Sequence, residues 1–223
     1  MSLLYALLNC TGNNAAATAT PSAFNKVALI GDSTIALYWC RTQSVSDIFF
    51  TASEIAAGKQ AVNLAVPGQT IFGQQGVWTD DAQKATYDVI IVQIGLNDMF
   101  QNQSELVEAV IARYQTLINT INAGKKAGAK IMVSCMLPAK ARWAGIPTDP
   151  VIAQAKWVAL NSAIMNTYST NITGVDYRNN LHVALLDDGA GNLAAAYNCG
   201  DGIHENAAGA IVIKDAMRTT LGI

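Results

Sequence analysis

Charged side chains are scarce in this sequence: they make up 13% of its 223 residues, whereas hydrophobic residues make up 51%. This composition excludes an intrinsically disordered chain, which combines low hydrophobicity with high charge. Lys and Arg never occur more than two in a row, and the formal net charge is -2, so no basic footprint of a nucleic-acid-binding protein is present. No stretch approaches the roughly 18 continuous apolar residues of a membrane span.

Cysteine is also scarce, and no pair has the Cys-x-x-Cys spacing of a zinc or redox motif. Four cysteines allow three disulfide pairings, among which a sequence cannot choose. Cys135 lies inside an apolar run, which favours a buried free thiol. The four cysteines are Cys10, Cys40, Cys135 and Cys199.

The beginning of the chain differs in composition from the rest. Residues 1–9 are apolar but short and carry no basic residue, so we expect no complete signal peptide here. Residues 11–23 resemble a polar Ala/Thr-rich linker. We therefore predict an extension over 1–23 and one domain over 24–223. Low Lys content favours an exported (secreted or periplasmic) protein, with the cytoplasm as the alternative, and the oligomeric state stays open.

Five short apolar runs, each rich in Val, Ile and Leu and closed by turn residues, alternate with helical patterns. Runs that are apolar on both faces are typical of buried parallel strands. The runs cover residues 26–30, 61–66, 88–94, 130–137 and 182–186. On this reading His182 opens the last strand and has a structural role.

Helices are expected between these runs, most clearly where apolar residues recur every three to four positions. Strand–helix alternation of this kind predicts an α/β domain with a parallel sheet covered by helices on both faces. In such a sheet, ligands bind beyond the carboxyl ends of the strands. The expected helices are 104–127, with Ser104 as its cap, 150–168, 207–221, a weaker helix directly after Ser33, and another within 44–59.

Ser33 closes the segment Gly31-Asp32-Ser33 at the end of the first predicted strand. A helix starting there would offer free N–H groups and positive potential to a developing oxyanion. The tripeptide alone carries little weight, because Asp or Ser at such a position commonly just caps a helix.

His204 is one of only two histidines and ends the segment Asp201-Gly202-Ile203-His204. A carboxylate three residues before a histidine can fold back and accept a hydrogen bond from Nδ1, which leaves Nε2 to take a proton from a serine. The alternative is a surface turn, since Asp-Gly is a common turn pair.

Asn97 and Gly68 follow two further predicted strands. The side-chain amide of Asn97, in Gly95-Leu96-Asn97-Asp98, can donate to a tetrahedral oxyanion. Gly68 lets a backbone N–H approach a substrate oxygen, although a Pro-Gly turn explains it equally well. The Ser, Asn and Asp-x-x-His elements occur together in this order by chance in about one sequence in ten thousand, so the set favours a nucleophilic site.

With these motifs the sequence resembles the SGNH hydrolases, also called GDSL esterases/lipases. The resemblance rests on GDST at Ser33, NLAVPGQT at Gly68, GLND at Asn97 and DGIH at His204. It implies a three-layer α/β/α sandwich of the flavodoxin-like type with a five-stranded parallel sheet. The first motif reads GDST rather than GDSL. The GDST form is similar to the corresponding motif of acetylesterases of the rhamnogalacturonan type. Glu205 and Asn206 stand where many relatives carry Pro or Leu.

The resemblance also implies roles for these residues. Ser33 is expected to be the nucleophile, His204 its base and Asp201 the third triad member, while the N–H groups of Ser33 and Gly68 and the Asn97 amide form the oxyanion hole. No metal or other cofactor is implied. Trp39, Trp78 and Trp143 are candidates for stacking on a sugar, although packing is the commoner role of such residues.

The expected function is therefore hydrolysis of carboxylic esters through an acyl-enzyme, with short acyl or acetyl esters on carbohydrate as the leading substrate. A lysophospholipase or thioesterase shares every catalytic residue and is one alternative. A non-catalytic binding module that retains the fold is the other. The expected partner is a small-molecule or saccharide ester, and neither a nucleic acid nor a membrane span is expected.

Overall fold

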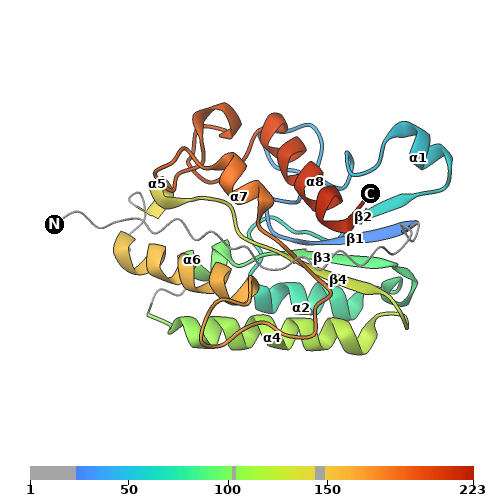
Figure 1. The fold of residues 1–223 in the computed structure, drawn as a ribbon, viewed down its shortest axis with the longest axis horizontal. Helices are drawn as coiled ribbons and strands as arrows, with labels where there is room; N and C mark the ends of the chain where they lie inside the picture. The colour runs from blue at the N-terminus through green and yellow to red at the C-terminus, as the bar shows by residue number, and fades with distance from the viewer. Residues whose placement is uncertain (1–23, 102–103, 144–148) are drawn as a thin grey trace.

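A five-stranded, fully parallel sheet forms the centre of the computed structural model, which describes residues 24–101, 104–143 and 149–223 (Figure 1). The strands lie in the order β2-β1-β3-β4-β5, which is the flavodoxin-like order. The predicted extension over 1–23 and Cys10 lie outside the described residues. The strands are β1 (Lys26–Gly31), β2 (Gln60–Asn63), β3 (Val89–Gln93), β4 (Lys130–Ser134) and β5 (Tyr177–Asn179).

Helices cover both faces of the sheet, which confirms the predicted α/β/α sandwich. Helices α2, α4 and α6 lie on one face, and α7 and α8 lie on the other (Figure 1). Within the described ranges no helix is long and apolar enough to cross a membrane. The helices are α1 (Ala52–Ala56), α2 (Ile71–Asp80), α3 (Leu96–Gln101), α4 (Val107–Gly124), α5 (Lys140–Trp143), α6 (Pro150–Ile164), α7 (Leu181–Leu186) and α8 (Ala207–Leu221).

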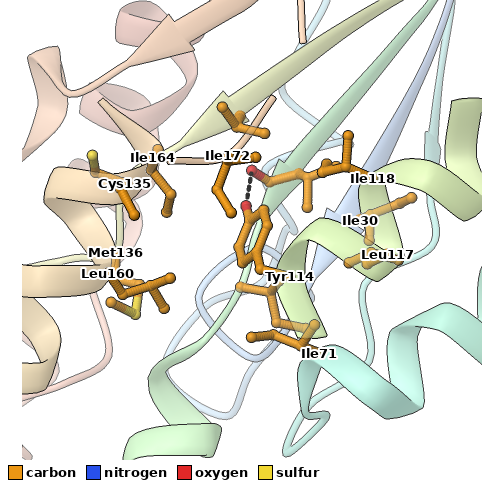
Figure 2. Packing of buried hydrophobic residues seen from close by; sticks show 14 of the residues in the cluster. Ile30, Ile71, Tyr114, Leu117, Ile118, Cys135, Met136, Leu160, Ile164 and Ile172 are labelled. Carbon is orange, nitrogen blue, oxygen red and sulfur yellow. Dashed lines mark hydrogen bonds between the residues drawn. The ribbon is translucent and has the colours of Figure 1, made fainter. Parts of the chain in front are cut away.

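The larger hydrophobic cluster lies between the sheet and α2, α4 and α6. Helix α4 contributes the predicted apolar stripe, and Tyr114 at its centre is fully buried. The phenol of Tyr114 donates a hydrogen bond to the Val92 carbonyl over 3.4 Å, so its one polar atom is paired within the core (Figure 2). Burying one large apolar side chain contributes about 1.5–3 kcal/mol to the free energy of folding. The same face of α4 buries several such side chains.

The second cluster lies on the opposite face, between the sheet and α8. Ile213 and Met217 of α8 are fully buried against Leu29 of β1 and Ile91 of β3. Helix α8 begins at the predicted residue because the Asn206 side chain accepts hydrogen bonds from the N–H groups of Ala208 and Gly209. Both faces of β1 and β3 are therefore covered, which explains their continuous apolar sequence.

The predicted fifth strand over 182–186 is wrong, because this run is helix α7 and the fifth strand is Tyr177–Asn179. Within α7 only His182 and Leu186 are buried, which is a helical spacing. His182 does not open a strand: its Nε2 donates to the Cys135 carbonyl over 2.9 Å, and its Nδ1 accepts from Asn179. Burial lowers the pKa of His182 to about 4, so its ring is neutral at pH 7.

The helix expected after Ser33 is also absent, and a single turn occupies residues 32–36. A continuing helix would need the carbonyls of Ser33 and Ala36 as acceptors for later N–H groups. Both carbonyls instead accept hydrogen bonds from the Arg41 guanidinium, at 2.9 and 2.5 Å. The interaction with Arg41 thus replaces the helical bonds.

Other boundaries differ by a turn or more. The expected helix within 44–59 shrinks to α1, which a capping box between Thr51 and Glu54 starts. Helix α4 begins after Leu106, so Ser104 is not its cap. Helix α2 has no counterpart in the predicted elements, since its two glycines weaken the helical pattern.

Candidate active site

The predicted site segments meet at the carboxyl ends of β1 and β3. These two strands are neighbours in the sheet. The strand that follows β1 in the chain lies on one side of the pair and the strand that follows β3 lies on the other, so a crevice opens between the two connecting segments. A pocket of about 300 Å³ lies there. Its lining residues are Asp32, Ser33, Tyr38, Gly68, Leu96, Asn97, Phe100, Gln101, Arg142, Ile203 and His204.

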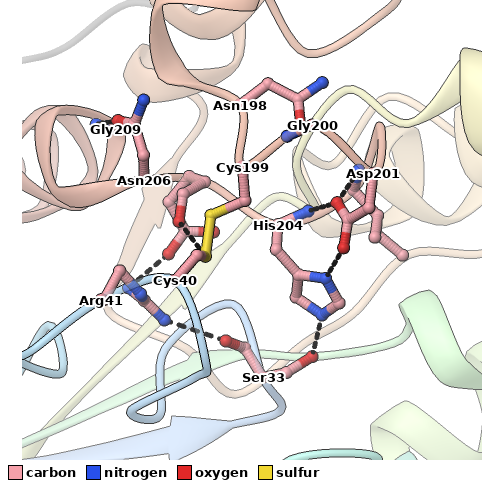
Figure 3. Close-up of a disulfide and its surroundings, with 12 residues drawn as sticks. Ser33, Cys40, Arg41, Asn198, Cys199, Gly200, Asp201, His204, Asn206 and Gly209 are labelled. Carbon is pink, nitrogen blue, oxygen red and sulfur yellow. Dashed lines mark hydrogen bonds and ion pairs between the residues drawn. A yellow bond between two sulfur atoms is a disulfide. The ribbon is translucent and has the colours of Figure 1, made fainter.

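Ser33, His204 and Asp201 form a continuous chain of hydrogen bonds (Figure 3). The Ser33 hydroxyl lies 2.8 Å from His204 Nε2, and His204 Nδ1 lies 2.5 Å from Asp201 Oδ2. The other carboxylate oxygen of Asp201 accepts from the backbone N–H groups of Ile203 and His204 at 3.0 and 2.9 Å. The carboxylate is thereby held by the backbone of the segment whose histidine it orients.

The protonation of this chain suits proton transfer from Ser33. Burial lowers the pKa of His204, Asp201 opposes that change, and the charges of Arg41 and Arg142 lower it further. Burial alone would raise the pKa of Asp201, but hydrogen bonds from His204 and Ile203 hold it below its usual range. At neutral pH a neutral imidazole therefore faces the hydroxyl, and an ionised carboxylate stands behind it.

Tyr38 packs flat against the imidazole of His204, with ring centroids 3.9 Å apart and an interplanar angle of 24°. Stacking restricts the rotation of the imidazole from one face of the ring, and the hydrogen bond to Asp201 restricts it at Nδ1. Tyr38 carries no motif and was not identified from the sequence.

Asn97 lies in the first turn of α3 and faces the same pocket. One hydrogen of its amide is used in a bond to the Gln69 carbonyl, at 2.9 Å, and the NH₂ group has a second one to offer. Gln101 reaches the Gly68 carbonyl at 3.4 Å, and Asp98 accepts from the Ile71 N–H at 3.0 Å. Helix α3 thus holds the Gly68 segment beside Ser33.

Gly68 adopts φ +77, a left-handed conformation that favours glycine. A Cβ at this position would meet no atom within 4 Å, so backbone conformation, rather than crowding, requires the glycine. The N–H groups of Ser33 and Gly68 make no hydrogen bond within the described part of the chain. Two backbone donors and one amide therefore border the pocket at the serine.

A buried ion pair behind the serine has no signal in the sequence. Arg41 Nη1 lies 2.5 Å from Glu205 Oε1, and both side chains are almost fully buried. Arg41 also donates to the Ser33 carbonyl, while Glu205 directly follows His204. Burial raises the pKa of Glu205 to about 8, against the effect of Arg41. The pair connects the serine segment to the histidine segment.

A disulfide joins Cys40 to Cys199 across the same two segments (Figure 3). The Cys199 N–H donates to the His204 carbonyl at 2.8 Å, so the covalent link lies beside His204. The sequence left the pairing open, and the structure selects this one. Cys135 is buried and is a thiol that forms no disulfide, as predicted.

A row of buried polar side chains crosses the sheet from the serine turn. The carboxylate of Asp32 accepts from Thr34, and burial raises the pKa of Asp32 to about 6. Thr34 accepts from Gln93 at 3.3 Å, and Ser134 donates to Gln93 at 3.1 Å. Gln93 and Ser134 are polar residues at the ends of the apolar runs of β3 and β4, and this was the one sign of the row in the sequence.

The tryptophans separate into different environments. Trp78 is 1% exposed and belongs to the core, so it is not a sugar platform. Trp39 is 69% exposed and directly follows Tyr38 in the chain. The side chain of Trp143 lies outside the described set. Among the described residues, no three His, Cys, Asp or Glu side chains gather where they could hold a metal ion.

Structures of similar architecture include several ester hydrolases. A lipase/acylhydrolase from Enterococcus faecalis has a TM-score of 0.60 at 18% identity, covering 89% of this chain and 96% of that one. The acetylxylan esterase Axe2 from Geobacillus stearothermophilus has a TM-score of 0.61 at 17% identity, covering 89% and 94%. A GDSL-like lipase from Bacteroides thetaiotaomicron has a TM-score of 0.60 at 14% identity, covering 89% and 88%. At these identities the likeness shows the fold.

No curated protein matches the chain in sequence. Residues 29–210 match the model of the GDSL-like lipase/acylhydrolase family, a span that includes Ser33, Gly68, Asn97, Asp201 and His204. The chain therefore belongs to the GDSL-like lipase/acylhydrolase family and is a serine hydrolase that acts on ester bonds.

Proposed function

We propose that this hydrolase removes short acyl groups, acetyl above all, from carbohydrate esters through an acyl-enzyme on Ser33. The observation that carries the catalytic part is the hydrogen-bonded chain from the Ser33 hydroxyl through His204 to Asp201, at 2.8 and 2.5 Å. It joins a nucleophile, a base and an orienting carboxylate in the arrangement that acyl transfer requires.

The reaction proceeds in two halves. Ser33 Oγ attacks the ester carbonyl as its proton moves to His204 Nε2, and the carbonyl oxygen becomes an oxyanion. The N–H groups of Ser33 and Gly68 and the Asn97 amide stabilise that charge. His204 then gives the proton to the leaving alcohol, which leaves an acyl group on Ser33. Water, activated by the same imidazole, releases the carboxylic acid and restores the serine.

The size and lining of the pocket support a short acyl group. Its volume of about 300 Å³ lies at the lower end of the range for small-molecule sites. Leu96, Phe100 and Ile203 supply a limited apolar wall, while Asn97 and Gln101 supply polar groups on the same lining. A long alkyl chain would need a larger apolar surface than these three side chains offer.

Three observations favour a carbohydrate leaving group. Trp39 is exposed and adjoins Tyr38, which lines the pocket, and exposed aromatic faces can stack on sugar rings. The GDST motif resembles that of rhamnogalacturonan-type acetylesterases, and one protein of similar structure is an acetylxylan esterase. The alternative is a lysophospholipase or thioesterase, which needs the same catalytic residues.

A panel of p-nitrophenyl esters from two to twelve carbons, followed by acetylated oligosaccharides, tests this proposal. We expect kcat/KM to be highest for acetate or propionate and to fall as the chain lengthens. A preference for acyl chains beyond about eight carbons would contradict the short-acyl part and favour the lipid hydrolase. Release of acetate from an acetylated oligosaccharide, absent in Ser33→Ala, would support the carbohydrate part.

We also propose that the protein works outside the reducing cytosol. The Cys40–Cys199 disulfide supports this, because disulfides persist mainly in oxidising compartments. Alkylation of the protein in its native source, followed by mass spectrometry, tests it. Labelling of Cys40 and Cys199 without prior reduction would contradict an oxidised native state.

A further inference from the structure

Arg142 lies on the short helix α5, which follows β4, and it borders the same pocket as Ser33 and His204. Its guanidinium carbon lies 5.9 Å from the centre of the Phe100 ring. Phe100 is itself part of the pocket wall, so its ring positions the positively charged guanidinium of Arg142 at the edge of the pocket. The side chain as a whole is exposed to solvent.

The guanidinium of Arg142 differs from the others in the protein. Arg41, Arg113, Arg178 and Arg218 each donate hydrogen bonds to protein oxygens. The Arg142 guanidinium makes neither a hydrogen bond nor an ion pair with any residue that the structure describes, and only the backbone N–H of Arg142 is bonded, to the Ala139 carbonyl. Its five N–H donors are therefore available to a ligand.

Among the described residues, no carboxylate forms an ion pair with this guanidinium. Asp201 is engaged by His204 and two backbone N–H groups. Asp32, at the base of the pocket, directs one oxygen to Thr34. The positive charge of Arg142 acts on His204, because it adds to the effect of burial in lowering the pKa of that histidine. Arg142 thus acts on the space in which the ester reacts.

We propose that Arg142 binds an anionic group of the ester substrate, a carboxylate or a phosphate, placed close to the scissile bond. On a carbohydrate, the carboxylate of a uronic acid next to the acetylated hydroxyl has this chemistry. The inference rests on the proposed ester hydrolysis at Ser33 and specifies its substrate class. A guanidinium suits the task, because its planar pair of N–H donors matches the two oxygens of a carboxylate or phosphate.

Paired esters, with the anionic group either free or methylated, test this role. Each kcat/KM is divided by the rate of uncatalysed hydrolysis of the same ester, because methylation also changes the acidity of the leaving phenol. The first pair is 4-acetoxybenzoate and its methyl ester, and the second is 4-acetoxyphenyl phosphate and its dimethyl ester. The quantity measured is the ratio of kcat/KM for the anionic ester to that for its neutral partner, at low ionic strength. We expect the ratio to exceed one for at least one pair and to fall as salt screens the charge. The pair with the larger ratio distinguishes a carboxylate from a phosphate.

Variants at Arg142 connect the ratio to the guanidinium. Arg142→Gln is expected to lower it about tenfold or more, the range for a lost hydrogen bond to a charged group. Arg142→Lys keeps the charge without the planar fork and is expected to retain part of the preference. Lys130→Gln is the matched control, because Lys130 starts β4 at the opposite edge of the sheet. It should leave the ratio unchanged.

Two outcomes would overturn the inference: wild-type ratios at or below one, or a ratio that is unchanged in Arg142→Gln, including the case in which both esters lose kcat/KM equally. Equal losses would assign Arg142 to the shared reaction rather than to an anionic group. The proposed catalysis is tested separately by Ser33→Ala. If that variant still hydrolyses the esters, the site assignment fails; if it is inactive while the Arg142 ratio stays constant, only the present inference fails.

Discussion

Arg41 and Glu205 form an ion pair in which the side chains are 1% and 0% exposed. The same guanidinium donates to the carbonyl of Ser33, and Glu205 directly follows His204. One buried contact therefore determines where both the serine and the histidine segments lie. Neutralising one partner of a buried ion pair leaves the charge of the other partner buried without a counter-ion, which destabilises the folded state.

Above the raised pKa of Glu205, where its carboxylate is ionised, Glu205→Gln should accordingly destabilise the fold by about 3 kcal/mol or more, measured by urea unfolding. A smaller kcat with little change in KM is expected for the folded fraction, since the pair positions Ser33 and His204 without contacting substrate. The control is Asp176→Asn, which breaks the exposed Lys130–Asp176 pair and should cost less than about 1 kcal/mol. Equal effects of the two substitutions would contradict the role given to the buried pair.

Asn97→Ala should lower kcat about 10²–10³-fold, equivalent to roughly 3–4 kcal/mol, if the amide stabilises the oxyanion. Because Asn97 also donates to the Gln69 carbonyl, a displaced Gly68 segment would contribute to the loss. Gln101→Ala removes the neighbouring contact to Gly68 and serves as the comparison. A loss below tenfold in Asn97→Ala, or an equal loss in both variants, would refute direct oxyanion binding.

The pH dependence of kcat/KM follows from the pKa of His204. Its ring must be neutral to accept the Ser33 proton, and burial lowers its pKa below 6.5. The acid limb should therefore be centred below pH 6.5, with activity declining as the pH falls through the lowered pKa. Asp201→Asn should move the midpoint further to acid, since Asp201 raises the pKa of His204. An acid limb centred above pH 6.5 in the wild type would contradict this environment.

The Cys40–Cys199 disulfide closes a loop with a sequence separation of 159. Cross-links over long loops typically contribute about 2–5 kcal/mol, so reduction should lower the free energy of unfolding by that amount. Urea unfolding with and without dithiothreitol measures the change. Cys40→Ala with Cys199→Ala should show the same stability as the reduced wild type, and reductant should not alter it further. Insensitivity of the wild type to reductant would argue against the bond.

Sequence patterns predicted the parts of the molecule that repeat a simple period or carry a motif. The stripe on α4 and the apolar strands β1, β3 and β4 are of this kind. The fifth strand was misplaced because β5 is only Tyr177–Asn179 and contains polar residues, while the apolar run beside it, 181–186, is helical. Short segments of this type are decided by packing, not by local preference.

Within the site, motifs located Ser33, Asn97, Asp201 and His204, and the structure brings them together around one pocket. Tyr38, Arg41 and Arg142 were missed because a single tyrosine or arginine in a loop has no spacing that marks it. Glu205 was noted only as an unusual neighbour of His204. Its importance depends on burial beside Arg41, which arises from contacts between residues far apart in the chain.

The central claim is that Ser33 attacks the ester and carries the acyl group. Incubation with a fluorophosphonate, followed by mass spectrometry of the intact protein and its peptides, tests this most directly. The account predicts one covalent adduct on the peptide containing Ser33, loss of esterase activity in proportion to labelling, and neither adduct nor activity in Ser33→Ala. Labelling at another residue, or hydrolysis that persists in Ser33→Ala, would contradict it.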